Sequence, residues 1–143
     1  MKAVVDASLS LKWQLRDEPD LEPADRLLLD AVNGRIDLVA PDLWLYEVVN
    51  GLRTAVARGR LSKEKGGVAI DDFIALGIAL YPFPSLAVRA YQLGNDFGLA
   101  VYDSAYLALA EHVSADLYTA DRPLFERTKG NLSFVKWFAE YHS

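Results

Sequence analysis

Short apolar runs alternate with longer segments of helical periodicity, and this alternation constrains the fold more than any other feature of the chain. Strand-like runs are expected at 2–5, 37–40, 77–81, 116–119 and 133–137. Helical segments are expected at 8–13, 22–32, 42–57, 62–76, 84–96, 102–112 and 122–129. Strands separated by helices pair in parallel and are covered on both faces. The pattern therefore predicts an α/β/α sandwich with a mainly parallel sheet of four to five strands.

Length and hydropathy favour one globular domain. With 143 residues, the chain can bury a substantial core and is expected to form a single domain over 1–143. Its apolar stretches stay below the roughly 18 residues that suggest a membrane-spanning helix. The amino terminus reaches Asp6 after only three apolar residues and lacks the apolar core of a secretory signal. We therefore expect a cytoplasmic protein with no membrane partner.

The chain has no cysteine, and this limits its chemistry. Disulfides, thiolate catalysis and cysteine-based metal sites are excluded, so any metal must be held by oxygen or histidine ligands. Of the two histidines, His112 lies late in an apolar helical segment and His142 lies in the terminal tail. Neither position suggests a general base.

Four acidic residues stand where such a fold would bring them together: Asp6, Glu47, Asp103 and Asp121. Asp6 and Asp121 follow strand-like runs, and the carboxyl ends of parallel strands are where open α/β folds build their sites. Clustered carboxylates without a basic partner repel one another, and a hard divalent cation relieves that repulsion. The first hypothesis is therefore a Mg²⁺ or Mn²⁺ site formed by these four residues.

Each carboxylate also has a structural explanation when it is taken alone. Asp6, Asp103 and Asp121 could cap helices or lie in first turns, where acids stabilise unpaired amides. Glu47 is different, because it lies mid-helix among apolar neighbours and needs a cation or a wet cleft. Ser8 is expected to cap the first helix, or else to supply a hydroxyl to the metal or to its surroundings.

The net charge of −5 is unusual for a protein that binds nucleic acid. A metal at the acidic cluster would neutralise most of that excess. One stretch is basic and contains only Glu64 as a counter-charge: Arg53, Arg58, Arg60, Lys63 and Lys65. These cations either decorate a helix end and a solvated turn or form a strip that contacts phosphates through Arg58, Arg60 and Lys63.

Four short motifs together resemble the PIN-domain family, particularly the VapC-type toxins of toxin–antitoxin pairs. They are Val4-Val5-Asp6-Ala7-Ser8, Glu47-Val48-Val49-Asn50, the run from Tyr102 to Ala110, and Thr119-Ala120-Asp121. They occur in the family's order and span nearly the whole chain. One departure is that Arg122 directly follows Asp121, which would bring a cation close to the fourth carboxylate.

The resemblance implies a metal-dependent endoribonuclease whose acidic quartet is Asp6, Glu47, Asp103 and Asp121. Supporting residues would be Ser8, Asn50 and Thr119. One ion held by the first three acids would activate a water molecule, and a second ion near Asp121 would stabilise the leaving oxygen. The products would carry a 5′-phosphate and a 3′-hydroxyl group. RNA is thus the implied substrate and Mg²⁺ or Mn²⁺ the implied cofactor.

The resemblance also implies two protein partners, a cognate antitoxin and a second copy of the chain. We expect an exposed apolar groove for docking, formed by residues that a small core does not consume: Trp13, Leu15, Trp44 and Leu45. An antitoxin could inhibit by inserting an arginine among the four carboxylates.

Other functions stay open at this point. The chain could be an RNA-processing nuclease outside a toxin–antitoxin pair, or a degenerate module that only binds a partner. A haloacid-dehalogenase-like phosphatase would need a second aspartate where Ser8 stands, and a phosphoacceptor receiver domain would need one where Leu80, Tyr81 and Pro82 stand.

Overall fold

The computed structural model describes residues 1–142 and places helices and strands close to the predicted segments. The elements are β1 (Lys2–Val5), α1 (Ala7–Ser10), α2 (Leu21–Val32), β2 (Asp37–Pro41), α3 (Leu43–Ala57), α4 (Lys63–Ala75), β3 (Ala79–Tyr81), α5 (Ala87–Phe97), α6 (Val101–His112), β4 (Asp116–Thr119), α7 (Arg122–Thr128) and β5 (Val135–Trp137). Short 3-10 turns cover Leu11–Trp13, Phe83–Ser85 and Phe138–Glu140.

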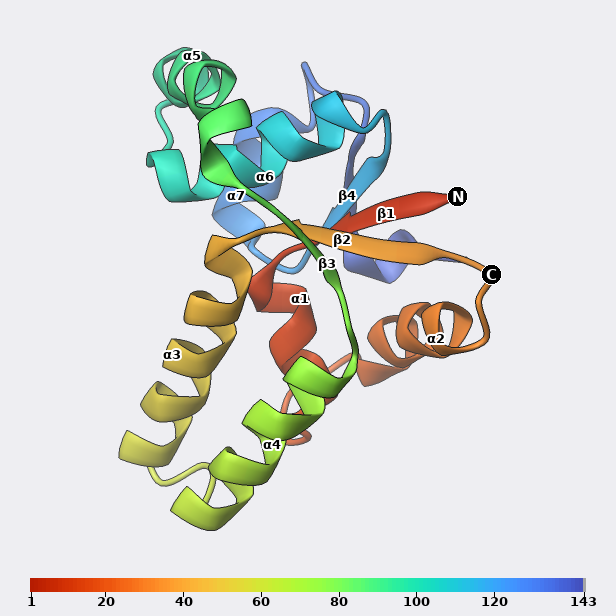
Figure 1. Cartoon of the computed structure of the whole chain (residues 1–143), viewed down its shortest axis with the longest axis vertical. Helices are drawn as coiled ribbons and strands as arrows, with labels where there is room; N and C mark the ends of the chain where they lie inside the picture. The colour runs from red at the N-terminus through yellow and green to blue at the C-terminus, as the bar shows by residue number, and fades with distance from the viewer. Residues whose placement is uncertain (143) are drawn as a thin grey trace.

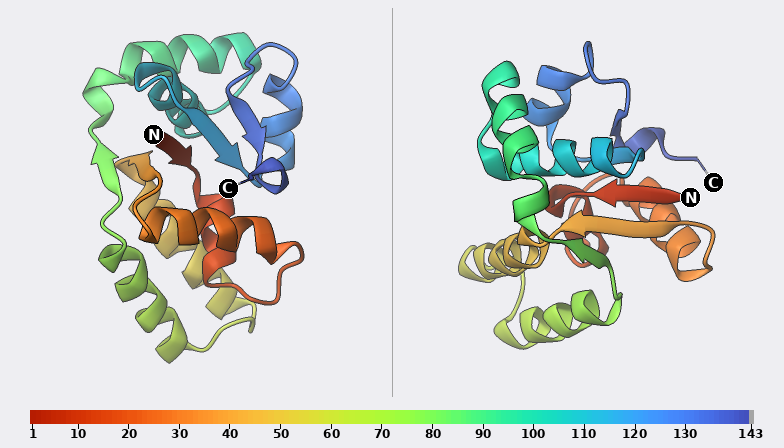
Figure 2. Two further views of the ribbon diagram at one scale, coloured as in Figure 1. Left: turned by 90° about the vertical axis from the view of Figure 1, so that its right-hand side faces the viewer. Right: turned by 45° about the horizontal axis from the view of Figure 1, so that its top comes forward.

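The five strands form one sheet in the order β3-β2-β1-β4-β5, and every neighbouring pair is parallel. The predicted α/β class, with a parallel sheet between helical layers, is therefore confirmed. Figure 1 shows the layers: α1 to α4 cover one face of the sheet, while α5, α6 and α7 cover the other. The two views in Figure 2 show the same separation.

The change of face follows from the connections between strands. From β1 to β2 to β3 the chain moves across the sheet in one direction, and from β3 to β4 to β5 it moves back in the other. Right-handed crossovers then put the first helices on one face and the later helices on the opposite face. The direction reverses between β1 and β4, and open α/β folds place their binding sites at the carboxyl ends of the strands beside such a reversal.

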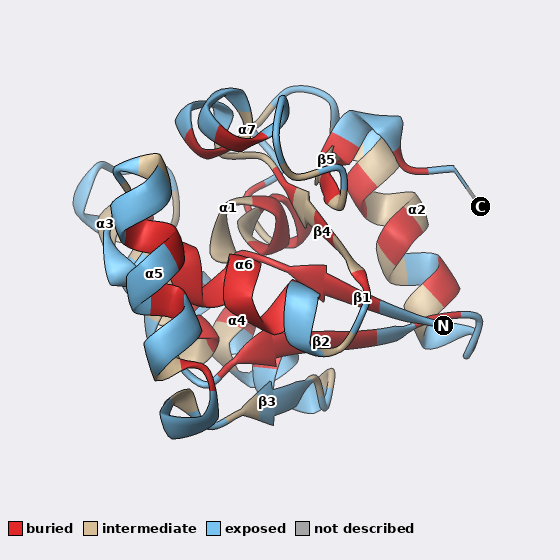
Figure 3. Cartoon of the chain, turned by 90° about the horizontal axis from the view of Figure 1, so that it is seen from above, coloured by how far each residue is buried: buried red, intermediate tan, exposed pale blue. Residues whose placement is uncertain are grey.

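The core lies on both faces of the central strands. Val4, Val5 and Leu117 are fully buried in β1 and β4. The helix α6 packs over β1 and β2, and all its residues from Ser104 to Ala110 are buried. Figure 3 shows this buried helix in the middle of the molecule, above the equally buried strands. Within the described residues, no helix is long and apolar enough to cross a membrane.

The start of the chain differs from the prediction in one detail. We predicted a helix over 8–13 capped by Ser8, but α1 is a single helical segment capped by Asp6 and followed by a 3-10 turn. Asp6 takes the cap because its backbone is extended and its carboxylate accepts the Leu9 amide hydrogen bond. Ser8 therefore lies inside the helix, where its hydroxyl is free for another partner.

The exposed loop that joins the 3-10 turn to α2 is tied to its surroundings by ion pairs. Arg60 binds both carboxylate oxygens of Asp17, and Arg16 binds both of Asp25. Lys12 contacts Glu18 at 3.3 Å. These contacts join the loop to α2 and to the turn between α3 and α4.

Candidate active site

Asp6 directly follows β1, beside the carboxyl end of β4, and is 5% exposed. Its Oδ1 atom accepts hydrogen bonds from the Ser8 hydroxyl at 2.7 Å and from the Leu9 amide at 3.0 Å. Its Oδ2 atom accepts a short hydrogen bond from the Thr119 hydroxyl. The parallel pairing of β1 with β4 makes this contact possible. Val5 is in register with Tyr118, so Asp6 and Thr119, the next residues, lie side by side.

Ser8 and Thr119 connect the two strand ends as well as holding Asp6. The Ser8 hydroxyl oxygen accepts the Ala120 amide at 3.0 Å, and the Thr119 hydroxyl oxygen accepts the Asp121 amide at 3.0 Å. Both hydroxyls therefore accept from the β4 end and donate to the β1 carboxylate. This network fixes the Asp6 side chain before any ligand is present.

The pKa of Asp6 is raised to about 6, chiefly by burial and to a smaller extent by the charge of Asp121. The hydrogen bonds from Thr119, Ser8 and Leu9 lower the pKa but do not offset burial. The carboxylate is thus ionised at neutral pH at a cost to the fold, which is the condition that a bound cation would relieve.

Glu47 projects from α3 toward the cluster and is half-buried. The Tyr106 hydroxyl of α6 donates a hydrogen bond of 2.5 Å to its Oε1 atom. Burial raises the pKa of Glu47, the Tyr106 hydrogen bond lowers it, and the charges of Asp103, Asp6 and Asp121 raise it. The sequence prediction missed Tyr106, although its place one helical turn after Asp103 could have suggested it.

Asp103 and Asp121 complete the cluster from the two helices on the other face of the sheet. Asp103 lies in the first turn of α6, and burial followed by the charge of Asp121 raises its pKa, against a lowering by Arg127. Asp121 caps α7 by accepting the Leu124 amide at 3.1 Å. The mutual effects on pKa place all four predicted acids in one electrostatic neighbourhood.

The donor set fits a hard divalent cation. All four groups are carboxylates, and none of them forms an ion pair with a basic side chain within residues 1–142. In the same residues, no group of three or more acidic or histidine side chains is already placed to enclose an ion. The arrangement therefore differs from a closed protein cage. It suits Mg²⁺, which is commonly held by one or two carboxylates and completes its shell with water and phosphate oxygens.

Asn50 lies one turn after Glu47 but is exposed on the outer side of α3. It lines a hollow of about 480 Å³ together with Leu45, Tyr46, Val49 and Leu80. Its supporting role at the cluster stays a prediction. Leu45 is half-buried and faces the same hollow, so it remains available to a partner.

The prediction that Trp13, Leu15 and Trp44 form an exposed docking surface is wrong, because all three are buried at 7%, 4% and 2% exposure. The Trp13 indole donates to the Ala24 carbonyl at 2.9 Å. The Trp44 indole donates to the Ser10 hydroxyl at 3.0 Å and so joins α3 to α1 beneath the site.

The basic strip is only partly free. Arg58 and Lys63 are exposed, and within the described chain neither forms an ion pair. Arg60 is committed to Asp17 at 2.8 Å and to Glu18 at 3.1 Å. It lines a hollow of about 360 Å³ that reaches Ser8 and Ala120 beside the cluster.

Arg122 directly follows Asp121, but its guanidinium is held by side chains that are not part of the acidic cluster. Its guanidinium lies 3.7 Å from the centre of the Trp137 ring and contacts Glu126 at 3.6 Å. Trp137 also packs against Phe125 and is only half-buried. Stacking and pairing therefore direct the positive charge toward the outer face of α7.

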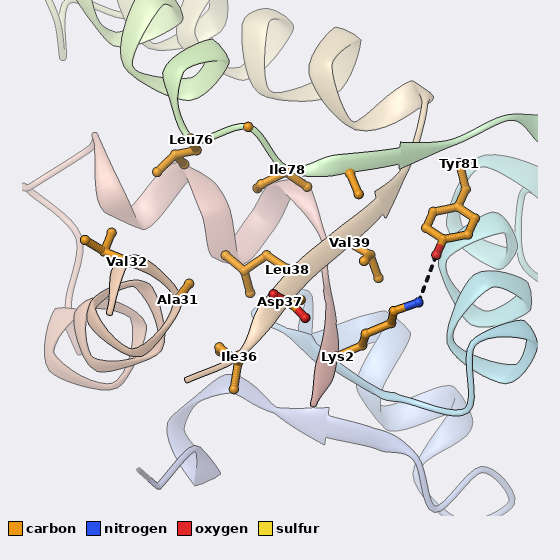
Figure 4. Close-up of a pocket in the computed structure, with 12 residues that line it drawn as sticks. Lys2, Ala31, Val32, Ile36, Asp37, Leu38, Val39, Leu76, Ile78 and Tyr81 are labelled. Atoms are coloured by element: carbon orange, nitrogen blue, oxygen red, sulfur yellow. Dashed lines mark hydrogen bonds between the residues drawn. The ribbon is translucent and has the colours of Figure 1, made fainter. Parts of the chain in front are cut away.

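A separate cavity of about 390 Å³ lies at the opposite, amino end of the strands. Figure 4 shows its largely apolar lining and the Lys2 ammonium group that donates to the Tyr81 hydroxyl at 3.3 Å. Asp37 is the one carboxylate in this lining. The cavity therefore lacks the clustered acids that distinguish the carboxyl end of the sheet.

Comparisons with known proteins agree with this architecture. Residues 3–131 match the family described as PIN domain. The chain is 34% identical to Ribonuclease VapC3 of Pyrobaculum aerophilum, over 89% of this chain and 95% of that protein. It is 33% identical to Ribonuclease VapC12 of Mycobacterium tuberculosis, over 82% of this chain and 85% of that protein.

One solved structure shares the fold. The crystal structure of PAE2754 from Pyrobaculum aerophilum aligns with a TM-score of 0.66 at 24% identity, over 91% of this chain and 81% of that chain. The segment matched by the family runs past both Asp6 and Asp121, so it contains the whole acidic cluster.

Proposed function

The chain belongs to the PIN domain family and is a VapC-type ribonuclease; we propose that it hydrolyses RNA phosphodiesters with Mg²⁺ or Mn²⁺ bound at Asp6, Glu47, Asp103 and Asp121. One observation carries the proposal: the four carboxylates lie close enough around the carboxyl ends of β1 and β4 to affect one another's pKa, and none of them forms an ion pair among the described residues. Family membership sets aside the phosphatase and receiver alternatives.

The protein's own residues position the reaction. Ser8 and Thr119 fix Asp6, Tyr106 fixes Glu47, and the amino end of α6 carries Asp103. A divalent cation bound there would supply an activated water and neutralise charge on the scissile phosphate. Without such a cation, the unpaired carboxylates would repel the phosphate group of the substrate. No side-chain nucleophile is required.

The chemistry of the new RNA ends tests the proposal. Neither histidine is placed to act as the general base that would activate the ribose 2′-hydroxyl as a nucleophile. Both are exposed, and His112 packs at the far end of α6 against Tyr81. We therefore expect hydrolysis by water, with 5′-phosphate and 3′-hydroxyl ends. Mass spectrometry of a short cleaved RNA identifies them, and a 2′,3′-cyclic phosphate would contradict a water nucleophile activated at this cluster.

We further propose that Arg58 and Lys63 contact RNA phosphates. Replacing either with Ala should weaken RNA binding. It should also make the plot of log binding constant against log salt concentration (the salt slope) less steep by about 0.7, the value for one phosphate contact on a single strand. Arg60→Ala is the matched comparison and should lower the slope less, because Asp17 and Glu18 already neutralise Arg60. Binding titrations at several salt concentrations measure the slopes. Equal salt slopes in the parent and all three variants would show that these residues are solvated and do not contact RNA phosphates.

As a VapC-type protein, the chain is the toxin of a toxin–antitoxin pair. We propose that its partners are a cognate antitoxin and a second copy of itself, acting in the cytoplasm where RNA is the substrate. Leu45, Tyr46 and Val49 support the self-association, because they line an apolar hollow on α3 and Tyr46 is 81% exposed. Light scattering during size-exclusion chromatography tests it, and a monomer at every concentration would contradict it.

A further inference from the structure

The hydrogen bond between Tyr106 and Glu47 engages only one of the two carboxylate oxygens. Tyr106 is 2% exposed, and its hydroxyl lies 2.5 Å from one specific oxygen, Oε1 of Glu47. Within residues 1–142 no other group donates to the Glu47 carboxylate. One oxygen is thus held by the phenol while the other, Oε2, is left for a ligand.

The contact also connects the two helices that bring acids from opposite faces of the sheet. Glu47 lies on α3, while Tyr106 lies on α6 one turn after Asp103. The phenol cannot follow a movement of Glu47, because Tyr106 is in the buried stretch of α6 that packs on β1 and β2. Rotation of the carboxylate to present both oxygens to one ion would therefore stretch or bend the hydrogen bond, which favours ligation through Oε2 alone.

We propose that Tyr106 is a positioning residue that limits Glu47 to one-oxygen ligation and thereby makes the site prefer Mg²⁺ or Mn²⁺ over Ca²⁺. This inference rests on the proposed metal-dependent function. Mg²⁺ requires near-octahedral geometry and binds through few carboxylate oxygens, whereas Ca²⁺ accepts six to eight oxygens and often binds a carboxylate through both. A Glu47 carboxylate whose rotation would strain this hydrogen bond is therefore better matched to the smaller ion.

The test measures metal binding without RNA, so that its readout is independent of cleavage. Mn²⁺ and Ca²⁺ are titrated separately by calorimetry into the parent protein and Tyr106→Phe, which removes only the hydroxyl. Loss of a hydrogen bond to a metal-binding side chain typically weakens metal affinity about 10- to 100-fold. We expect that loss for Mn²⁺, with Ca²⁺ affinity unchanged or higher, so that the Mn²⁺-to-Ca²⁺ preference falls at least about tenfold.

Tyr141→Phe is the matched control. Tyr141 is also buried and its hydroxyl also donates to a carboxylate, that of Asp30, which is outside the acidic cluster. The control should lose a comparable hydrogen bond while keeping the parent's metal preference. Thermal unfolding of each variant shows whether the fold is intact.

The outcomes separate this inference from the proposed function. A parent that binds neither ion would overturn the metal site and this inference with it. A parent that binds Mn²⁺, with the same preference in Tyr106→Phe, would overturn only the role of Tyr106, even if both affinities fall together. A parent that binds Ca²⁺ as tightly as Mn²⁺ would overturn that role without any variant.

Discussion

Asp6→Asn should make the protein more stable above pH 6 while it removes RNA cleavage. Asp6 is buried, and its ionised form is disfavoured in the fold by desolvation and by Asp121. Asparagine keeps the shape, accepts the Leu9 amide and can donate to the Thr119 hydroxyl oxygen, but it carries no charge. It should therefore preserve the helix cap while it removes the cost of burying a charge and the smaller repulsion by Asp121.

The direction and size of the expected change in unfolding free energy follow from the pKa of Asp6. The pKa is about 6 in the fold against an ordinary value of 3.8, so the folded state binds more protons between these two pH values. The free energy of unfolding of the parent should therefore fall as pH rises from about 4 to 6 and stay lower above that range. A pKa difference of about two units corresponds to about 3 kcal/mol of unfolding free energy at pH 7.5.

Urea unfolding of the parent and Asp6→Asn in EDTA, at pH 7.5 and at pH 4, measures this difference. We expect the variant to be more stable at pH 7.5 and the two proteins to converge at pH 4, where Asp6 is protonated. Asp30→Asn is the control, because Asp30 is also buried but pairs with Arg35 and accepts the Tyr141 hydroxyl. It should lose stability at pH 7.5. An Asp6→Asn variant less stable than its parent at that pH would show that the buried charge of Asp6 does not destabilise the fold.

Stability and activity are thus opposed at this site. The raised pKa values of Asp6, Glu47 and Asp103 share burial as their largest cause. Ordinary packing would neutralise or pair such groups. The presence of these unpaired acids is consistent with a function that requires negative charge at the carboxyl ends of β1 and β4.

The sequence predicted the strand ends well because local signals specify them. Asp6 follows a run of β-branched residues, and Asp121 precedes Pro123 at a helix start, so both positions could be read from neighbouring residues. The alternation of strands and helices then placed both acids at one edge of the sheet. Glu47 could be identified because its apolar neighbours leave a mid-helix acid without an obvious structural role.

Long-range partners could not be read in this way. Arg60 pairs with Asp17, 43 positions earlier in the chain, so its commitment to an ion pair has no local signal. A docking role for Trp13 and Trp44 assumes that a small core does not consume them, whereas both are buried and each indole donates to an internal acceptor. In the sequence, Tyr106 is one of several apolar residues of a helix. Its role is visible only in the structure, where its hydroxyl lies 2.5 Å from Oε1 of Glu47.

Asp103→Asn should reduce RNA cleavage more than about 100-fold, because losing a direct metal ligand should exceed the 10- to 100-fold typical of a supporting residue. Asp103 is suited to this test, since within residues 1–142 its side chain makes no hydrogen bond or ion pair that the fold would lose. The matched control is Asp96→Asn, an exposed aspartate on α5. It should cleave RNA at the parent's rate.

The most direct test of the acidic cluster is the initial rate at which the purified proteins cleave an end-labelled single-stranded RNA, with Mg²⁺ or Mn²⁺ and again with EDTA. We predict that the parent and Asp96→Asn cleave only with the metal ion, and that Asp103→Asn, folded by circular dichroism, does not cleave at a comparable rate under either condition. Cleavage by the parent in EDTA, or by Asp103→Asn at the parent's rate with metal, would contradict the assignment of this cluster as the metal-dependent active site.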